Sequence, residues 1–378
     1  MSGTGKRSTP KPRVKAAAPK RAVPAGAAPP DAPSLAVPSE AEPPTAVPVP
    51  VPVPGPGPVL AAVPVPAAPP GLAHLPLPLL VLPMGLGGLG LAWREAATVL
   101  GAPGAIGEAL LALTALLWLV VVGGQVLRAL RYPDAMLAEL RHPVRVAFAA
   151  APTVALMILA GAVWPHAPGF GAGLWGVAVA LHLVVAMLLL RRVLAGRGEV
   201  AMLAPPLLIP FVGNILAPVF GARMGFLDAS WMMFGVGTLL WLAVLPLLLH
   251  RLLAGPPLPF AMRPSIAIFV APPAVGALAV AALTGQAHGL ALAFTGVALL
   301  VAAAVLSLAR ELARVPFSLS WWGVTFPSAA FAVMLMGQGF HPVFGWLALA
   351  LNTALTGWVA WRTAKAARAG VFLRPEAH

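Results

Sequence analysis

The 378-residue chain contains no cysteine and little charge, since Asp, Glu, Lys and Arg together make up only 9% of it. Without cysteine there can be no disulfide, thiolate nucleophile, zinc ribbon or iron–sulfur cluster. Because soluble domains carry about 25% charged residues, a soluble fold is also excluded. The chain is instead 60% hydrophobic, with a mean hydropathy of +0.90. These values predict an all-α membrane protein that crosses the bilayer several times.

The small number of charges is strongly biased toward positive ones, with a net charge of +13. In a soluble chain such an excess would suggest nucleic acid as a partner. Here the basic residues sort by membrane side, as shown below. We therefore expect no nucleic-acid partner.

Residues 1–75 differ from the rest of the chain and are predicted to form a disordered cytoplasmic tail. Residues 1–70 hold 20 of the 44 prolines, and proline cannot donate to a helix or a sheet ladder. Seven basic residues and no acidic ones lie between Lys6 and Arg21. They either contact anionic lipid weakly or stay solvated and fix the topology, the second being favoured. No apolar run of 7–15 residues follows them, so the tail is not a signal peptide.

Ten apolar stretches follow, each long enough, or nearly so, to cross about 30 Å of hydrocarbon as a helix. They define a membrane domain over 76–364 and leave a short cytoplasmic tail at 365–378. The expected spans are 78–93, 105–130, 144–164, 171–194, 205–222, 229–253, 264–284, 288–313, 318–338 and 342–364.

The positions of the basic residues predict the orientation. With the N-terminus inside, 22 of the 24 Lys and Arg fall on the cytoplasmic side, and only Arg94 and Arg223 fall outside. This is the bias of the positive-inside rule, and a miscounted span would invert every later loop. We expect a multi-pass protein of the inner (plasma) membrane, surrounded by lipid, with both termini in the cytoplasm.

Proline occurs inside every odd-numbered span, whereas Pro246 is the comparable proline of the even spans. Proline kinks a helix and frees a carbonyl, which lipid tolerates badly. The sequence therefore predicts five helical hairpins, in which kinked odd helices line a central pore and straighter even helices face lipid. The odd-helix prolines are Pro83, Pro152, Pro210, Pro218, Pro272, Pro273 and Pro327.

The predicted path is nearly free of charge, because the acidic residues of the membrane domain lie at span ends or in loops. Proton and sodium pumps normally place a carboxylate at mid-membrane, so passive passage of an anion is favoured. Asn214 and Thr325 are candidate polar residues of the path. His142, Arg145 and Arg263 are candidates for a basic inner mouth that attracts anions. His142 and Arg145 could equally begin an interfacial helix that binds lipid phosphate.

A membrane-embedded enzyme is the competing class. It would need paired acids, a serine–base pair or metal ligands inside the bundle. The spans offer no such grouping, and no histidines and carboxylates share metal-ligand spacing. We therefore predict that the protein is not an enzyme and uses neither metal nor cofactor.

Four motifs carry a resemblance to a known family. The chain resembles the bacterial tellurite-resistance protein A, the fungal dicarboxylate (malate) transporters and the plant guard-cell slow anion channel. The resemblance covers about residues 76–364. The motifs are PMGLGGLGLAW at 83–93, HPVR at 142–145 with Pro152 after it, APP at 271–273 after Arg263-Pro264, and SWWGVTFP at 320–327, the most specific.

The resemblance implies ten helices in a quasi-fivefold ring, a homotrimer, and a pore blocked midway by a phenylalanine that Phe326 matches. The residue type of Phe326 alone would instead favour a packed core side chain. Val81 departs from the family, because it occupies the position of a small residue near the gate and could narrow the pore. A proton-coupled dicarboxylate or tellurite efflux transporter remains the alternative to a passive channel. Whether flux is ohmic and independent of pH would separate the two.

Overall fold

The computed structural model describes residues 71–374, and every regular element in that part of the chain is a helix. Residues 1–70 of the predicted tail lie outside the described residues. The two ends of the described part meet, because the amide of Gly71 donates to the carbonyl of Leu373 (2.7 Å). The last long helix, α13 (Pro342–Arg368), continues past residue 364, where the sequence predicted the membrane domain to end.

Nine helical segments of the described residues are long and apolar enough to cross a membrane, and they coincide with nine of the ten expected spans. They are Leu77–Val99, Gly104–Arg131, Arg145–Val163, Pro168–Leu194, Leu227–Ala254, Phe260–Thr284, Leu290–Ser307, Leu319–Gly337 and Pro342–Arg368. The chain is thus an all-α, multi-pass membrane protein.

The remaining expected span, 205–222, is a shorter and broken segment, Pro205–Gly221. Its prolines interrupt the backbone hydrogen bonding that a continuous α-helix requires. It is consequently divided into η5 (Pro205–Leu207), α6 (Leu208–Val212), η6 (Gly213–Leu216) and α7 (Ala217–Gly221).

The spans divide by burial into an inner and an outer set. In the four long odd-numbered spans, 61–78% of the residues of the most apolar stretch are buried, against 17–33% in the even-numbered ones. Apolar outer faces suit lipid, where burial in protein gives a helix no hydrophobic advantage. The inner helices are α1 (Val81–Val99), α4 (Ala151–Val163), α6 with α7, α9 (Ala271–Thr284) and α12 (Trp322–Gly337); the outer ones are α2 (Gly104–Arg131), α5 (Pro168–Leu194), α8 (Leu227–Ala254), α10 (Leu290–Ser307) and α13.

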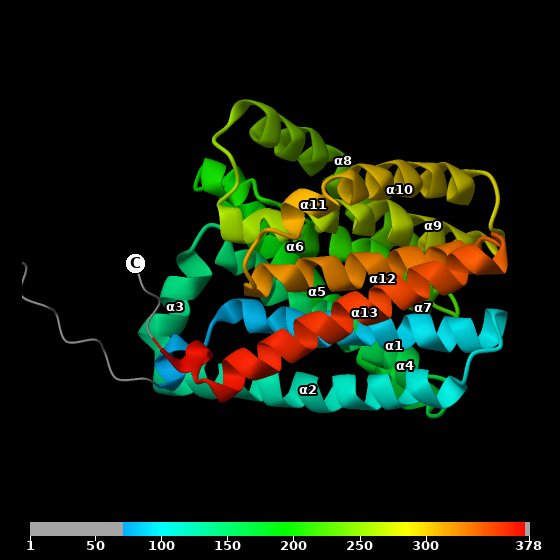
Figure 1. The fold of residues 1–378 in the computed structure, drawn as a ribbon, viewed down its shortest axis with the longest axis horizontal. Helices are drawn as coiled ribbons and strands as arrows, with labels where there is room; N and C mark the ends of the chain where they lie inside the picture. Colours follow the sequence, from blue (N-terminus) through cyan, green and yellow to red (C-terminus); the bar gives the residue numbers. More distant parts are fainter. Residues whose placement is uncertain (1–70, 375–378) are drawn as a thin grey trace, which may run out of the picture. The chain divides into compact units, whose positions relative to one another are not determined.

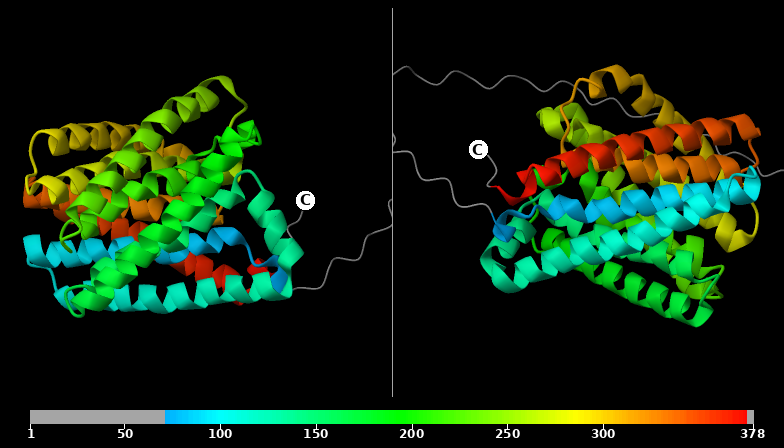
Figure 2. Two further views of the ribbon diagram at one scale, coloured as in Figure 1. Left: turned by 180° about the vertical axis from the view of Figure 1, so that it is seen from behind. Right: turned by 60° about the horizontal axis from the view of Figure 1, so that its bottom comes forward.

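Contacts among the inner helices enclose a common centre. Contacts run from α1 to α4, from α4 to α7, from α7 to α9, from α9 to α12 and from α12 back to α1. Each inner helix also contacts the outer helix that follows it in the chain. Figure 1 shows the long helices running roughly side by side, and the second panel of Figure 2 shows α2, α1, α12 and α13 as neighbours.

All five inner segments begin as a 3-10 helix and continue as an α-helix. The 3-10 parts are η2 (Leu77–Leu80), η3 (Arg145–Ala150), η5, η7 (Phe260–Val270) and η8 (Leu319–Trp321). Pro152 and Pro272 stand in the first turn of α4 and α9, where an N–H would have no partner in the helix. These prolines therefore mark a change of helix type, whereas Pro327 lies inside α12.

Five shorter elements complete the described fold. They lie on the connections at one end of the bundle and beside the ends of the described chain. They are η1 (Leu72–His74) with η9 (Val371–Leu373), α3 (Pro133–Arg141) with η4 (Val200–Met202), and α11 (Ala309–Leu312).

Candidate functional site

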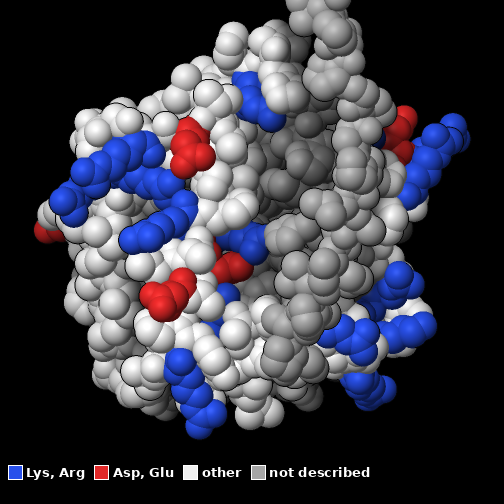
Figure 3. All heavy atoms as spheres, turned by 90° about the vertical axis from the view of Figure 1, so that its left-hand side faces the viewer, with Lys and Arg blue, Asp and Glu red and all other residues white. Residues whose placement is uncertain are grey.

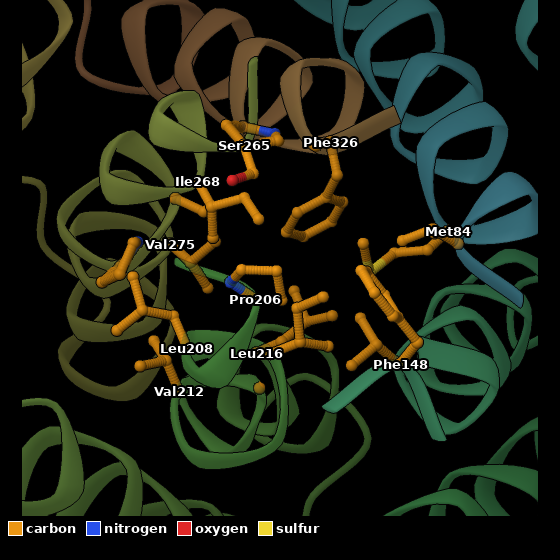
Figure 4. A pocket seen from close by; sticks show the side chains of 18 of the residues that line it. Met84, Phe148, Pro206, Leu208, Val212, Leu216, Ser265, Ile268, Val275 and Phe326 are labelled. Carbon is orange, nitrogen blue, oxygen red and sulfur yellow. The ribbon is translucent and has the colours of Figure 1, made fainter. Parts of the chain in front are cut away.

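A small cavity lies at the centre enclosed by the inner segments. All five inner segments line it, and its volume is about 50 Å³, on the scale of one or two water molecules. Its walls are almost entirely apolar and carry no ionisable side chain. Side chains labelled in Figure 4 include Met84, Phe148, Leu216, Ile268 and Phe326.

Phe326 projects its ring into the middle of this cavity (Figure 4). The residue lies in the second turn of α12 and is only partly buried. On the other side α1 approaches at Gly88, where an added Cβ would lie 3.1 Å from ring atom Cδ2. The ring therefore occupies space that a side chain on α1 would otherwise fill.

A buried polar network supports the backbone around Phe326. Pro327 has no N–H and so leaves a carbonyl of the preceding turn unpaired. The amide of Asn352, on α13, donates to the Thr325 carbonyl (3.0 Å) and to Ser328 Oγ (2.8 Å). Ser328 Oγ also lies within hydrogen-bond distance of the Val324 carbonyl (2.8 Å). An outer helix thus holds the kinked part of α12 in place.

The predicted path residues divide between the cavity wall and the helix contacts behind it. Val81, Pro272, Phe326 and Pro327 line the cavity. Val81 is buried there, so a branched side chain does occupy the narrow region. The remaining candidates, which lie outside the described cavity wall, are Pro83, Pro152, Pro210, Asn214 and Thr325.

Asn214 and Thr325 bond within their own helices and do not line the cavity. The Asn214 amide donates to the carbonyl of Phe211 (3.1 Å), and Thr325 Oγ1 donates to the carbonyl of Trp322 (2.8 Å). Pro83 and Pro210 are buried among the helices. The carbonyl of Pro152 accepts from Trp118 Nε1 of α2 (2.9 Å). These residues shape the helices around the path, although the buried Oδ1 of Asn214 has no hydrogen-bond partner among the described residues.

The starts of the inner segments form one face of the domain, here called the N-terminal face; the opposite face, where they end, is the C-terminal face. Of the Lys and Arg in the described residues, 15 lie at the N-terminal face and two at the C-terminal face. Four acidic residues accompany the 15, and Figure 3 shows how basic side chains dominate this face.

The three predicted basic-mouth residues lie at this face in different surroundings. Nδ1 of His142 accepts from the amides of Val144 and Arg145 (3.2 Å each), so His142 caps the start of η3. The Arg145 guanidinium bonds Glu139 (2.6 Å), which also lies 4.0 Å from buried Arg128. The Arg263 guanidinium stacks 5.0 Å above the ring of Phe260. The face is therefore a network of charges, with Arg145 held by a carboxylate.

A second, larger cavity opens among the C-terminal ends of the same five inner segments. Its volume is about 600 Å³, and its wall includes Arg94, Glu95 and Arg223. The sequence marked the two arginines only as exceptions to the charge bias and placed Glu95 beyond the first span. The helix instead continues to Val99 and carries Glu95 into the cavity.

Two further buried polar residues were missed because they lie on outer helices. Asn352 is described above. His182 of α5 is fully buried, with Nδ1 2.7 Å from Thr153 Oγ1 of α4. Its ring lies directly behind Gly213, where an added Cβ would be 2.6 Å from Nε2. The sequence signal that could have identified Asn352 and His182 is that each is a polar residue within an apolar run. No cluster of His or acidic residues able to hold a metal occurs in residues 71–374.

Comparison with known proteins agrees with this geometry. Residues 74–365 match the family described as SLAC1, voltage-dependent anion channel. The chain is 28% identical over 247 residues to S-type anion channel SLAH2 of Arabidopsis thaliana, which covers 64% of this chain and 47% of that protein. It is 26% identical over 214 residues to the guard cell S-type anion channel SLAC1 of the same plant, covering 55% and 38%.

A relative from a second organism also matches the chain. The uncharacterized transporter MJ0762 of Methanocaldococcus jannaschii is 25% identical over 255 residues, covering 56% of this chain and 69% of that protein. The chain matches less than half the length of the two plant relatives. The family match nevertheless spans nearly all of the described residues and confirms the resemblance inferred from the sequence motifs: the chain belongs to the voltage-dependent anion channel family.

Proposed function

We propose that the protein is a passive channel for small anions whose path runs through the centre of the inner helices and is gated by Phe326. The observation that carries this proposal is the position of the Phe326 ring, which projects into an apolar cavity lined by all five inner segments (Figure 4). The names of the plant relatives, S-type anion channels, support anions as the permeant species.

The cavity as it stands is a closed gate. The cavity volume of about 50 Å³ is too small for a hydrated anion. The apolar walls also offer no polar groups to replace the water that the ion would have to lose. Hydrophobic constrictions close channels in this way. Rotation of one ring out of the centre would join the space on the two sides of Phe326.

Anion selectivity follows from charge outside the constriction. The excess of Lys and Arg on the N-terminal face raises the local concentration of anions at that entrance. The constriction itself is neutral, so it adds no charge of either sign. The described wall of the constriction holds no carboxylate, which favours passive passage over proton coupling, because proton-coupled transporters normally place an ionisable group at mid-membrane.

The test is the reversal potential in planar bilayers. Phe326→Ala channels in a chloride gradient should show currents that reverse near the chloride equilibrium potential and do not move when a pH gradient is added. A reversal potential that follows the pH gradient would establish the alternative, a proton-coupled dicarboxylate or tellurite efflux transporter. Exchanging chloride for nitrate, malate and tellurite would then rank the permeant anions.

The proposed channel has ten spans in a quasi-fivefold ring, with the N-terminal face and both termini in the cytoplasm. The lack of cysteine makes single introduced thiols unambiguous reporters. An impermeant reagent applied to intact cells should label Gly169→Cys and His288→Cys but not Arg197→Cys, all three positions being exposed. The reverse pattern would contradict the orientation.

We also propose a homotrimer with one path in each protomer, on the strength of the family resemblance. The exposed apolar outer helices provide surface both for lipid and for neighbouring protomers. A detergent-corrected mass of three chains is expected. A mass of one or two chains would exclude the trimer and leave the single-protomer path intact.

A further inference from the structure

The C-terminal cavity lies on the same path as the gate. Its wall comes from the last turns of α1, α4, α7, α9 and α12 and the residues after them, and the starts of those inner segments line the small cavity around Phe326. Segments that enclose one centre at both levels place the two cavities in line. An ion that passes Phe326 must therefore cross the C-terminal cavity.

The charged residues in the wall of this cavity differ in whether they have an ion-pair partner. Arg94 makes a two-pronged bond to Glu108 of α2 (2.6 and 2.7 Å) and also donates to the carbonyl of Ala162 (3.2 Å). Its positive charge is therefore matched by a partner carboxylate, which leaves Glu95 and Arg223 as the other charged groups in the wall.

Glu95 is turned away from its neighbour Arg94 and reaches toward α12. A Cβ added to Gly337 would lie 3.9 Å from Glu95 Oε1, so the carboxylate extends across from α1 to the end of α12. The side chain is partly buried, and no basic group of the described residues lies within 4.0 Å of it. Arg223 of the same wall is exposed, and its charge is near enough to act on Glu95 electrostatically.

We propose that Glu95 is the residue that limits anion throughput in the C-terminal half of the path and that Arg223 opposes it. This inference rests on the proposed anion path. A fixed carboxylate lowers the local concentration of anions and a fixed guanidinium raises it. The path then has a strongly basic entrance at one end and a cavity at the other in which Glu95 repels the permeant ion.

The size and salt dependence of the effect follow from Coulomb's law. Removing a unit charge at about 8 Å from a solvated anion changes its local concentration about twofold in water. Screening shortens the reach of that charge from about 10 Å at 0.1 M salt to about 3 Å at 1 M. A change in pore width, by contrast, would act at every salt concentration.

The experiment compares single-channel conductance in the Phe326→Ala background at 0.1 M and 1 M chloride. Adding Glu95→Gln should about double the conductance at 0.1 M, most strongly when the C-terminal side supplies the anion, and change it little at 1 M. Adding Arg223→Gln should lower it by a similar factor at 0.1 M, and Glu95→Asp should leave it near the background value.

Asp228→Asn is the matched control, because Asp228 is an exposed acid at the start of α8 on the same face and outside the cavity wall. It should leave the conductance unchanged. An unchanged conductance in Glu95→Gln, or a gain equally large at 1 M, would overturn the role of Glu95 and leave the path intact. A Phe326→Ala background that carries no current would overturn the proposed path and this inference with it.

Discussion

The inner and outer helices of this domain have overlapping mean hydropathies, 1.3–2.3 for the long inner spans and 1.5–2.4 for the outer ones, yet differ in how closely they are packed. At Gly85, Gly161 and Gly276, on inner helices, an added Cβ would overlap a side chain of a neighbouring helix. At Gly123, Gly176 and Gly296, on outer helices, it would meet open space. Outer helices also have closely packed glycines, such as Gly237 against Ile215 and Gly345 against Met336, on the side that faces the inner helices. The outer set is therefore packed on one side and open on the other, whereas the inner set is packed closely throughout.

The difference explains how a gate can be held in a membrane protein. A ring in the path needs a backbone that does not drift, and close contacts among inner helices provide it. The outer helices contribute few but specific polar contacts, such as Asn352 to the kink of α12. Substitutions on the inner helices should therefore have larger effects than matched substitutions on the outer faces.

Gly85→Leu should abolish folding, because Gly85 is where α1 crosses α12. Even a Cβ at this position would overlap Thr325 Oγ1 and lie 2.8 Å from the ring of Trp322. Gly123→Leu, on the open face of α2, should be tolerated. Yield of monodisperse protein in detergent measures both, and equal yields would show that the inner contact is not tightly packed.

Asn352→Leu should destabilise the domain by about 1–3 kcal/mol, the cost of leaving buried polar partners unsatisfied. Its amide bonds both the Thr325 carbonyl and Ser328 Oγ beside the gate. Ser307→Ala, which removes an exposed hydroxyl of α10, should change stability by less than about 0.5 kcal/mol. Thermal unfolding in detergent compares them, and a Tm equal to wild type for Asn352→Leu would remove this residue as a support of the kink.

Arg263→Gln should give the smallest effect, a loss of about half the anion conductance at low salt that fades at 1 M. Arg263 lies on inner η7, so its charge is near the entrance. Arg310→Gln removes an exposed charge of the same face beyond outer helix α10 and should matter less. Single-channel recording in the Phe326→Ala background measures both, and equal losses would mean that the face acts only through its total charge.

The sequence was sufficient to predict the inner and outer sets, because apolar length and the odd-helix prolines are local features of the chain. After the first span, the other eight long spans were predicted to within about four residues at each end. The exception is the C-terminal end of the span at 290–307, which was predicted too late. The first span was ended too early, since Arg94 and Glu95 interrupt the apolar run. Arg94 is tolerated there through its bond to Glu108, a partner that sequence alone does not identify.

The side on which an inner residue faces could not be predicted. An inner helix is apolar on all sides, so no hydrophobic period separates the path from the helix contacts. Asn214 and Thr325 were therefore assigned to the path, although their polar groups bond their own helices. Phe326 was placed by its resemblance to the family gate, and its position in the central cavity is consistent with that assignment.

The conductance of Phe326→Ala beside that of Phe331→Ala tests the central claim most directly. Both residues lie on α12 and are partly buried against the core, but Phe326 lines the cavity and Phe331 does not. We predict large anion currents from Phe326→Ala with a yield near wild type. Phe331→Ala removes the same kind of ring without touching the described cavity wall and should carry no added current. Wild-type conductance in Phe326→Ala, or equal currents from both variants, would contradict the gate.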